Sequence, residues 1–168
     1  RLIDVAVDAN ADAVKFQLFS AESLYPKGTK EYDSVKAVEL NPDWIEPLNT
    51  HAAERNICFM ASAFDISSVD ILESVDVCAH KIASSETTNL PLLSYIATKK
   101  RPVIISTGMC DMVDISEAVL TCHQNDNESI VLLQCYALYP LPIERANIAV
   151  MDSLQELFQL PTGFSDHT

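Results

Sequence analysis

Polar side chains follow short apolar runs at six places in the sequence. Two of them are lysines, Lys15 and Lys81, which lie within or at the end of such runs, where an unpaired charge is costly. Lysine supplies a point charge and serine and threonine supply oriented donors, so together they could hold a phosphate and a carboxylate. The pattern therefore predicts anion recognition. The polar residues at the run ends are Lys15, Gln17, Ser62, Asp65, Lys81, Ser84, Ser85, Glu86, Ser106, Thr107, Gln134, Tyr136, Tyr139, Ser165, Asp166 and His167.

Each of these residues also has a structural interpretation. A serine at a strand end commonly caps the following helix. Lys81 could form an ion pair with Glu86 or Asp65, bind a ligand, or act as a Schiff-base lysine. His167 could be structural or a metal ligand. Because the sequence has no HxH or HExxH spacing, a metal site built from this segment alone would be incomplete.

The apolar runs themselves predict the elements that position these side chains. They are continuous rather than alternating, which is typical of strands buried on both faces of a parallel sheet. Lys15 and Gln17 are two residues apart, so their side chains should point the same way from one strand. The six runs cover residues 13–17, 57–61, 77–82, 102–106, 130–135 and 160–165.

Helical patterns alternate with these runs. Asn41 is a plausible N-cap with Pro42 at the first helical position, and further helices are predicted from Asp65 or Ser67 and from near Asp111 or Asp114. The segment between residues 19 and 41 is predicted to be a long loop. The other helical patterns cover residues 69–75, 90–97, 115–120 and 148–158, and the chain also opens on one.

Strands that alternate with helices imply right-handed crossovers and an α/β fold with a parallel sheet. Six such units fit either an open doubly wound sheet or three-quarters of a (β/α)₈ barrel. The chain of 168 residues contains only three glycines, and neither GxGxxG nor a P-loop is present. That disfavours dinucleotide binding. In a barrel, the functional residues collect at the carboxyl ends of several strands.

Composition excludes several classes of function. With 24 acidic and 11 basic residues the net charge is −13, which argues against binding nucleic acid or an anionic membrane surface. No apolar stretch approaches the length of a membrane span. The five cysteines form no CxxC motif, and we expect small buried thiols in a reducing cytoplasm, with a zinc site or a nucleophilic cysteine as the alternative.

Several motifs, taken in their order and spacing, resemble the sialic acid synthase family, which comprises N-acetylneuraminate synthases and their legionaminate and pseudaminate relatives. No single motif is decisive, but the ordered set is specific and runs through essentially the whole chain. The motifs are Ala11-Asp12-Ala13-Val14-Lys15-Phe16-Gln17, Lys81-Ile82-Ala83-Ser84-Ser85-Glu86, Thr88-Asn89-Leu90-Pro91-Leu92-Leu93, Ile105-Ser106-Thr107-Gly108-Met109, Leu133-Gln134-Cys135 with Tyr139-Pro140, and Gly163-Phe164-Ser165-Asp166-His167-Thr168.

The resemblance implies a TIM barrel that condenses phosphoenolpyruvate with an N-acylated amino sugar, giving a nine-carbon 2-keto sugar acid and phosphate, a transferase reaction of the EC 2.5.1 class. A divalent metal, Mn²⁺ or Mg²⁺, binds the open-chain aldehyde in that family. Residues 1–168 would be an incomplete catalytic domain holding strands two to seven. The first strand with its catalytic glutamate, a second metal histidine, the last strand and a C-terminal antifreeze-like domain would lie outside it. The segment alone should then be inactive, and the full-length protein a homodimer.

The resemblance also assigns roles by position. Lys15 would bind phosphoenolpyruvate and take part in catalysis, and Glu86 matches a family acid near the chemistry. His167 would be one of two metal-binding histidines. The other substrate-binding positions would be Gln17 for the sugar, Ser62 for phosphoenolpyruvate, Lys81 and Ser84 for its carboxylate or phosphate, and Ser106, Ser165 and Tyr139 at the phosphate.

The sequence departs from the family pattern at three positions, and two other functions stay open. Ala137 stands where a polar Asn or Ser is common, Ser85 where Gly is usual, and Ala63 where Pro is usual. These differences bear on the acceptor, which could be N-acetylmannosamine, its 6-phosphate or a diacetylated sugar. The alternatives are a Schiff-base barrel aldolase that uses Lys81 or Lys15, and a relative that binds sugar or phosphoenolpyruvate without turnover.

Overall fold

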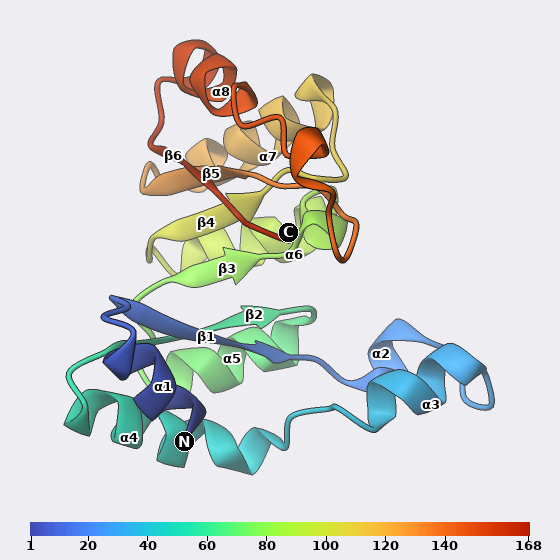
Figure 1. Ribbon diagram of the computed structural model, residues 1–168, viewed down its shortest axis with the longest axis vertical. Helices are drawn as coiled ribbons and strands as arrows, with labels where there is room; N and C mark the ends of the chain where they lie inside the picture. The colour runs from blue at the N-terminus through green and yellow to red at the C-terminus, as the bar shows by residue number, and fades with distance from the viewer. The chain divides into compact units, whose positions relative to one another are not determined.

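The computed structural model describes residues 1–168 as two compact units, Arg1–His80 and Lys81–Thr168 (Figure 1). The first unit contains α1 (Leu2–Asp8), β1 (Ala13–Leu18), α2 (Ala21–Leu24), α3 (Lys30–Lys36), a 3₁₀ turn (Pro42–Trp44), α4 (Ile45–Glu54), β2 (Cys58–Ala63) and α5 (Ile66–Ser74). In the second unit are β3 (His80–Ile82, which starts at the last residue of the first), α6 (Leu90–Thr98), β4 (Val103–Ser106), α7 (Met112–Gln124), β5 (Ile130–Gln134), α8 (Val150–Phe158) and β6 (Thr162–Phe164). Two more 3₁₀ turns span Ser84–Glu86 and Ile143–Arg145.

All the strand pairs that the structure defines residue by residue are parallel. In the first unit β1 pairs with β2, and this register places Gln17 opposite Ser62. In the second unit β4 pairs with β5 and β5 with β6, and the strands follow chain order from β3 to β6. A doubly wound sheet reverses its strand order at a switch point, whereas an unreversed order with right-handed crossovers keeps the helices on one face. The topology therefore favours the barrel.

The prediction of strands buried on both faces is confirmed for β2 and β3, but it is wrong for β1, whose residues alternate between less and more exposed, and for β6, which buries none. In the first unit Phe59 and Ala61 of β2 pack in a core with Val69 and Leu72 of α5, and Val69 and Leu72 are fully buried. The second unit has a larger core of aliphatic side chains at the centres of its helices and strands: Leu93, Ile96, Val103, Ile105, Ala118, Leu132 and Leu154. No helix combines the length with the apolar character needed to cross a lipid bilayer.

The predicted helix starts are confirmed by their caps. The Asn41 side chain accepts a hydrogen bond from the Asp43 amide at 3.0 Å, with Pro42 at the first position of the turn that leads into α4. Asp65 caps α5 by accepting from the Ser68 amide at 2.7 Å. Each of these side chains satisfies an amide that has no partner within its helix.

Two sequence expectations need correction. The predicted loop between residues 19 and 41 contains α2 and α3. The helix α2 has only four residues and α3 has no buried residue, so neither has an apolar stripe by which the sequence would reveal it. The start of α3 is stabilised by a cap: the Thr29 hydroxyl accepts from the Tyr32 amide at 3.2 Å. The third strand is also shorter than its apolar run, since only residues 80–82 are extended in a ladder.

The capping box of α7 provides a test of the local fold. Asp111 accepts from the Val113 and Asp114 amides at 2.7 and 3.0 Å, and Asp114 accepts from the Asp111 amide. Asp111 is exposed, so its substitution removes the cap and little else. We expect Asp111→Ala to lower the free energy of unfolding by about 1 kcal/mol, measured by urea denaturation, and Asp111→Ser to restore most of it. Equal stability of wild type and Asp111→Ala would contradict this role.

Candidate active site

A buried lysine is the middle residue of β3, one position before its carboxyl end. The side chain of Lys81 is only 7% exposed, and its ammonium donates to Ser106 Oγ at 2.5 Å and to the Ile82 carbonyl at 2.6 Å. Ser106 ends the neighbouring strand β4, and its own carbonyl accepts from Thr87 Oγ1 at 2.8 Å. A lysine ammonium can donate three hydrogen bonds, and these contacts account for two of them. The structure brings two of the predicted site residues, Lys81 and Ser106, into contact, and their roles in binding stay predictions.

A second group of contacts surrounds Ser84, which follows β3. Its hydroxyl oxygen accepts from the Gly108 amide at 3.1 Å and lies 3.0 Å from the Cys135 sulfur. Ser84 is part-buried and Cys135 is 3% exposed. Residues that follow β3, β4 and β5 therefore meet at one hydroxyl. This is a suitable donor position for an anion at the edge of the sheet.

His167 is held by the segment that follows β5. Its Nδ1 lies 2.6 Å from the Tyr136 carbonyl, its Nε2 lies 3.1 Å from the Tyr139 hydroxyl and 3.4 Å from that of Ser165, and its ring stacks on Tyr139 with centroids 4.1 Å apart. Because a carbonyl only accepts, Nδ1 donates to it, and in the neutral ring the Nε2 lone pair faces the two hydroxyls. The structure thus brings three predicted residues, Tyr139, Ser165 and His167, into contact.

This tautomer suits a metal ligand. A metal-bound histidine usually donates its other N–H to a carbonyl or carboxylate, which is the arrangement at Nδ1. Across residues 1–168, however, no group of three or more His, Cys, Asp or Glu side chains is placed to hold one metal ion. His167 therefore offers one nitrogen ligand, and its role in a metal site stays a prediction.

Glu86 is engaged within its own turn. One carboxylate oxygen accepts from Asn89 Nδ2 at 3.0 Å and the other from Ser85 Oγ at 3.1 Å. Asn89 is in turn the N-cap of α6, accepting from the Leu92 amide. These contacts give Glu86 a structural role at the start of α6, and its catalytic role stays a prediction.

In the first unit the predicted residues line the ends of two paired strands. Lys15 and Gln17 are both exposed, on one face of β1, and both line a cavity of about 400 Å³ with Phe16, Phe19, Val38 and Leu40. Surrounding protein atoms desolvate the ammonium, so the pKa of Lys15 is lowered from 10.5. Ser62, the partner of Gln17 in the sheet register, is 1% exposed. The ligand roles of these three residues stay predictions.

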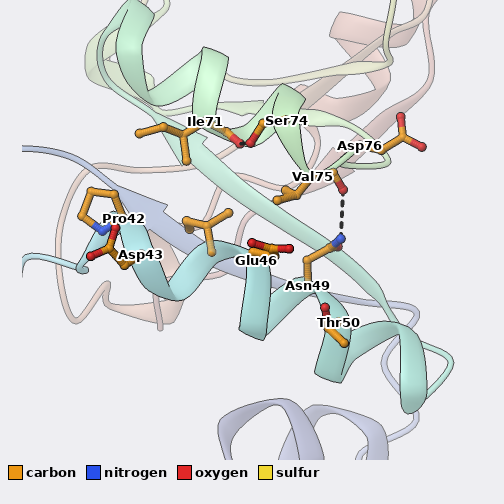
Figure 2. A pocket seen from close by; sticks show the side chains of 10 residues that line it. Pro42, Asp43, Glu46, Asn49, Thr50, Ile71, Ser74, Val75 and Asp76 are labelled. Carbon is orange, nitrogen blue, oxygen red and sulfur yellow. Dashed lines mark hydrogen bonds between the residues drawn. The ribbon is translucent and has the colours of Figure 1, made fainter.

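A cavity of about 840 Å³ lies within the first unit, between α4 and α5 (Figure 2). Figure 2 shows Asn49 Nδ2 reaching the Val75 carbonyl across it, at 2.9 Å. Asp43, Glu46 and Asp76 also line it. The cavity contains none of the predicted site residues, and its carboxylates do not suit an anionic substrate.

Sequence reasoning missed two partners in the second unit. Cys135 was expected to be a small buried thiol, which it is, but it also contacts Ser84. The Tyr136 carbonyl holds His167, and a main-chain contact has no sequence signature. Of the other cysteines, Cys122 is buried, whereas Cys58 and Cys78 are exposed; all five are free thiols. Gln134, another strand-end residue, donates to the Ala146 carbonyl and is structural.

Comparison with known proteins places these contacts in context. Residues 2–168 match the NeuB family. The N,N'-diacetyllegionaminic acid synthase of Legionella pneumophila is 38% identical, over 99% of this chain and 52% of that protein. The spore coat polysaccharide biosynthesis protein SpsE of Bacillus subtilis is also 38% identical, over 99% of this chain and 48% of that protein. The chain thus spans about half the length of the curated relatives it matches.

A solved structure shows the same fold. The N-acetylneuraminic acid (sialic acid) synthetase of Leptospira borgpetersenii, crystallised with citrate, aligns with a TM-score of 0.95 and 31% identity, over 100% of this chain and 59% of that one. With the unreversed strand order, this likeness confirms the predicted fold class, a partial (β/α)₈ barrel of parallel strands alternating with helices.

The close approach of Gly108 to Cys135 gives a prediction. A Cβ at residue 108 would lie 2.6 Å from the Cys135 sulfur and 2.8 Å from its carbonyl oxygen. We expect Gly108→Ala to cost about 1–3 kcal/mol of stability, because the backbone carbonyl cannot yield easily. Gly163→Ala is the control, since its Cβ would meet only the end of the Leu133 side chain at 3.0 Å. Thermal denaturation measures both, and equal melting temperatures would contradict the prediction.

Proposed function

Because the chain belongs to the NeuB family, we propose that the full-length protein is a sialic-acid-type synthase. It condenses phosphoenolpyruvate with an N-acetylated amino sugar, such as N-acetylmannosamine, to give a nine-carbon 2-keto sugar acid and phosphate. Relatives of this chain are named synthases of legionaminic, pseudaminic and sialic acids, which supports this reaction class. The acceptor stays open among the sugars that those names imply.

The buried ammonium of Lys81 is the observation that carries the proposal. In a chain of net charge −13, binding of a strongly anionic substrate needs a local positive site. Lys81 provides it, with Ser106 at the end of the next strand. The Ser84 hydroxyl follows the same strand as Lys81 and adds a neutral donor. Carboxyl ends of barrel strands are where such enzymes bind their substrates.

The chemistry needs positioning and charge compensation rather than a covalent bond to the protein. The enol carbon of phosphoenolpyruvate attacks the aldehyde carbon and forms the new C–C bond. Water adds to the cationic carbon that results, and the tetrahedral intermediate expels phosphate by cleavage of the C–O bond. In this reaction Lys81 and Ser106 hold the anionic groups in place while their charge redistributes.

The proposed metal site includes His167. A divalent ion, Mn²⁺ or Mg²⁺, would act as a Lewis acid on the aldehyde oxygen of the sugar. His167 would bind it through Nε2, while Nδ1 stays hydrogen-bonded to the Tyr136 carbonyl and fixes the ring orientation. Tyr139 and Ser165, which contact Nε2 in the structure, would then turn to other partners.

The remaining expectations belong to the same proposal. Lys15, Gln17 and Ser62 bind substrate, and Lys15 and Glu86 take part in catalysis. The free cysteines are compatible with a reducing compartment, which supports a cytoplasmic location. We also expect the full-length protein to be a homodimer, which sedimentation would test by giving its mass in solution.

Substitution of Lys81 tests the proposed binding of phosphoenolpyruvate. We expect Lys81→Ala in the full-length protein to weaken phosphoenolpyruvate binding at least about 30-fold by calorimetry, because a buried, hydrogen-bonded charge is lost. Lys99→Ala is the matched control: Lys99 lies just after α6, over the Tyr95 ring, and should leave affinity unchanged. Unchanged affinity in Lys81→Ala would sink the assignment. A covalent adduct of wild type with pyruvate after borohydride reduction would favour the aldolase instead.

Substitution of His167 tests whether this residue binds the proposed metal ion. We expect His167→Ala to lose most of the Mn²⁺ affinity of the full-length protein, measured by electron paramagnetic resonance of free Mn²⁺ in the absence of substrate. His123→Ala, a substitution of an exposed histidine on α7, should bind Mn²⁺ like wild type. If His167→Ala binds Mn²⁺ as tightly as wild type, the ion is held elsewhere and this role is wrong.

A further inference from the structure

Cys135 is the first residue after β5, and its sulfur is buried against Ser84 and Gly108. It is 3% exposed, and its Sγ lies 3.0 Å from Ser84 Oγ. A side chain at residue 108 would have to displace that sulfur. The glycine therefore keeps the Gly108 amide and the Cys135 thiol close to the same hydroxyl. Such a packed arrangement leaves the thiol little freedom to point elsewhere.

The hydrogen-bonding capacity of the Ser84 hydroxyl decides what the thiol does. A hydroxyl has two lone pairs and one hydrogen. The Gly108 amide donates to one lone pair at 3.1 Å. If the Cys135 thiol donates to the other, the Ser84 hydrogen must point away from both, toward a further acceptor. If instead Ser84 donates to the sulfur, it has no hydrogen left for a ligand.

An anion selects the first arrangement, because it accepts hydrogen bonds and offers none. We propose that Cys135 is a positioning residue, whose thiol occupies the second lone pair of Ser84 and so directs the Ser84 hydrogen to the anionic group of the substrate. This inference rests on the proposed function, since it takes the anion to be phosphoenolpyruvate. It adds a role for a residue that does not itself touch the substrate.

The thiol suits this position better than a carboxylate or an imidazole. It is a weak donor and a weak acceptor, so it can serve as either partner of Ser84 as the site fills and empties. A permanently charged acid here would repel the substrate.

The test compares binding of phosphoenolpyruvate, and of inorganic phosphate, to variants of the full-length protein by calorimetry. We expect Cys135→Ala to raise the dissociation constant about three- to tenfold, the range for one hydrogen bond. Cys135→Ser, which keeps a donor and an acceptor, should recover most of the affinity. Cys122→Ala is the matched control, because Cys122 is a buried cysteine on α7 and should change stability without changing affinity.

A double-mutant cycle separates positioning from a general loss of packing. In the Ser84→Ala background, Cys135→Ala should change the dissociation constant by less than about twofold, because its effect passes through the Ser84 hydroxyl. Equal affinity of Cys135→Ala and wild type, no recovery with Cys135→Ser, or a full effect without Ser84 would each overturn the inference and leave the proposed function standing. If wild type binds neither phosphoenolpyruvate nor inorganic phosphate, both this inference and the proposed function fail.

Discussion

The buried ammonium of Lys81 is the constraint on which the rest of the strand-end chemistry depends. A charge removed from water is tolerated only where hydrogen bonds compensate its lost hydration. Lys81 obtains them from its neighbouring residue in β3 and from Ser106 at the end of β4. Thr87 then fixes the Ser106 main chain from the segment that leads into α6. One cation therefore determines which residue types the adjacent strand end and turn must carry.

The same edge of the sheet is organised by main-chain groups as much as by side chains. The Gly108 amide fixes the Ser84 hydroxyl, the Tyr136 carbonyl fixes the His167 ring, and the Leu141 amide donates to the His167 carbonyl at 2.7 Å. Gly108 and Tyr136 each lie two residues after a strand, β4 and β5, whereas Leu141 lies farther along the segment that follows β5. The first two contacts therefore lie close to strand ends, where the sheet restricts the main chain. Groups with little freedom lose little entropy when a ligand binds.

The fold was predictable because its strands are apolar runs and its main helices carry caps, both of which depend on local sequence. The cap at Asn41 was predicted directly, and those at Asp65 and Asp111 were each one of two candidates at most three residues apart. The helices α2 and α3 were missed because they bury almost nothing and leave no periodic pattern. Within the site, residue types placed Lys81 and Ser106 among the strand-end residues. Their hydrogen bond, and the contact of Ser84 with Cys135, 51 positions away, were not predicted because both depend on register between strands.

The anchoring of His167 by main-chain atoms has a consequence for how this protein can diverge. Its ring nitrogen and carbonyl are held by the backbone of residues 136 and 141, so neither contact depends on which side chains lie between. Ala137 and Leu138 are both exposed there. Mutation can therefore introduce new side chains at these two positions while the imidazole stays in place, which under the proposed function would allow the acceptor to change. Ala137, which differs from the family pattern, lies at a position where neither contact to His167 restricts the choice of side chain.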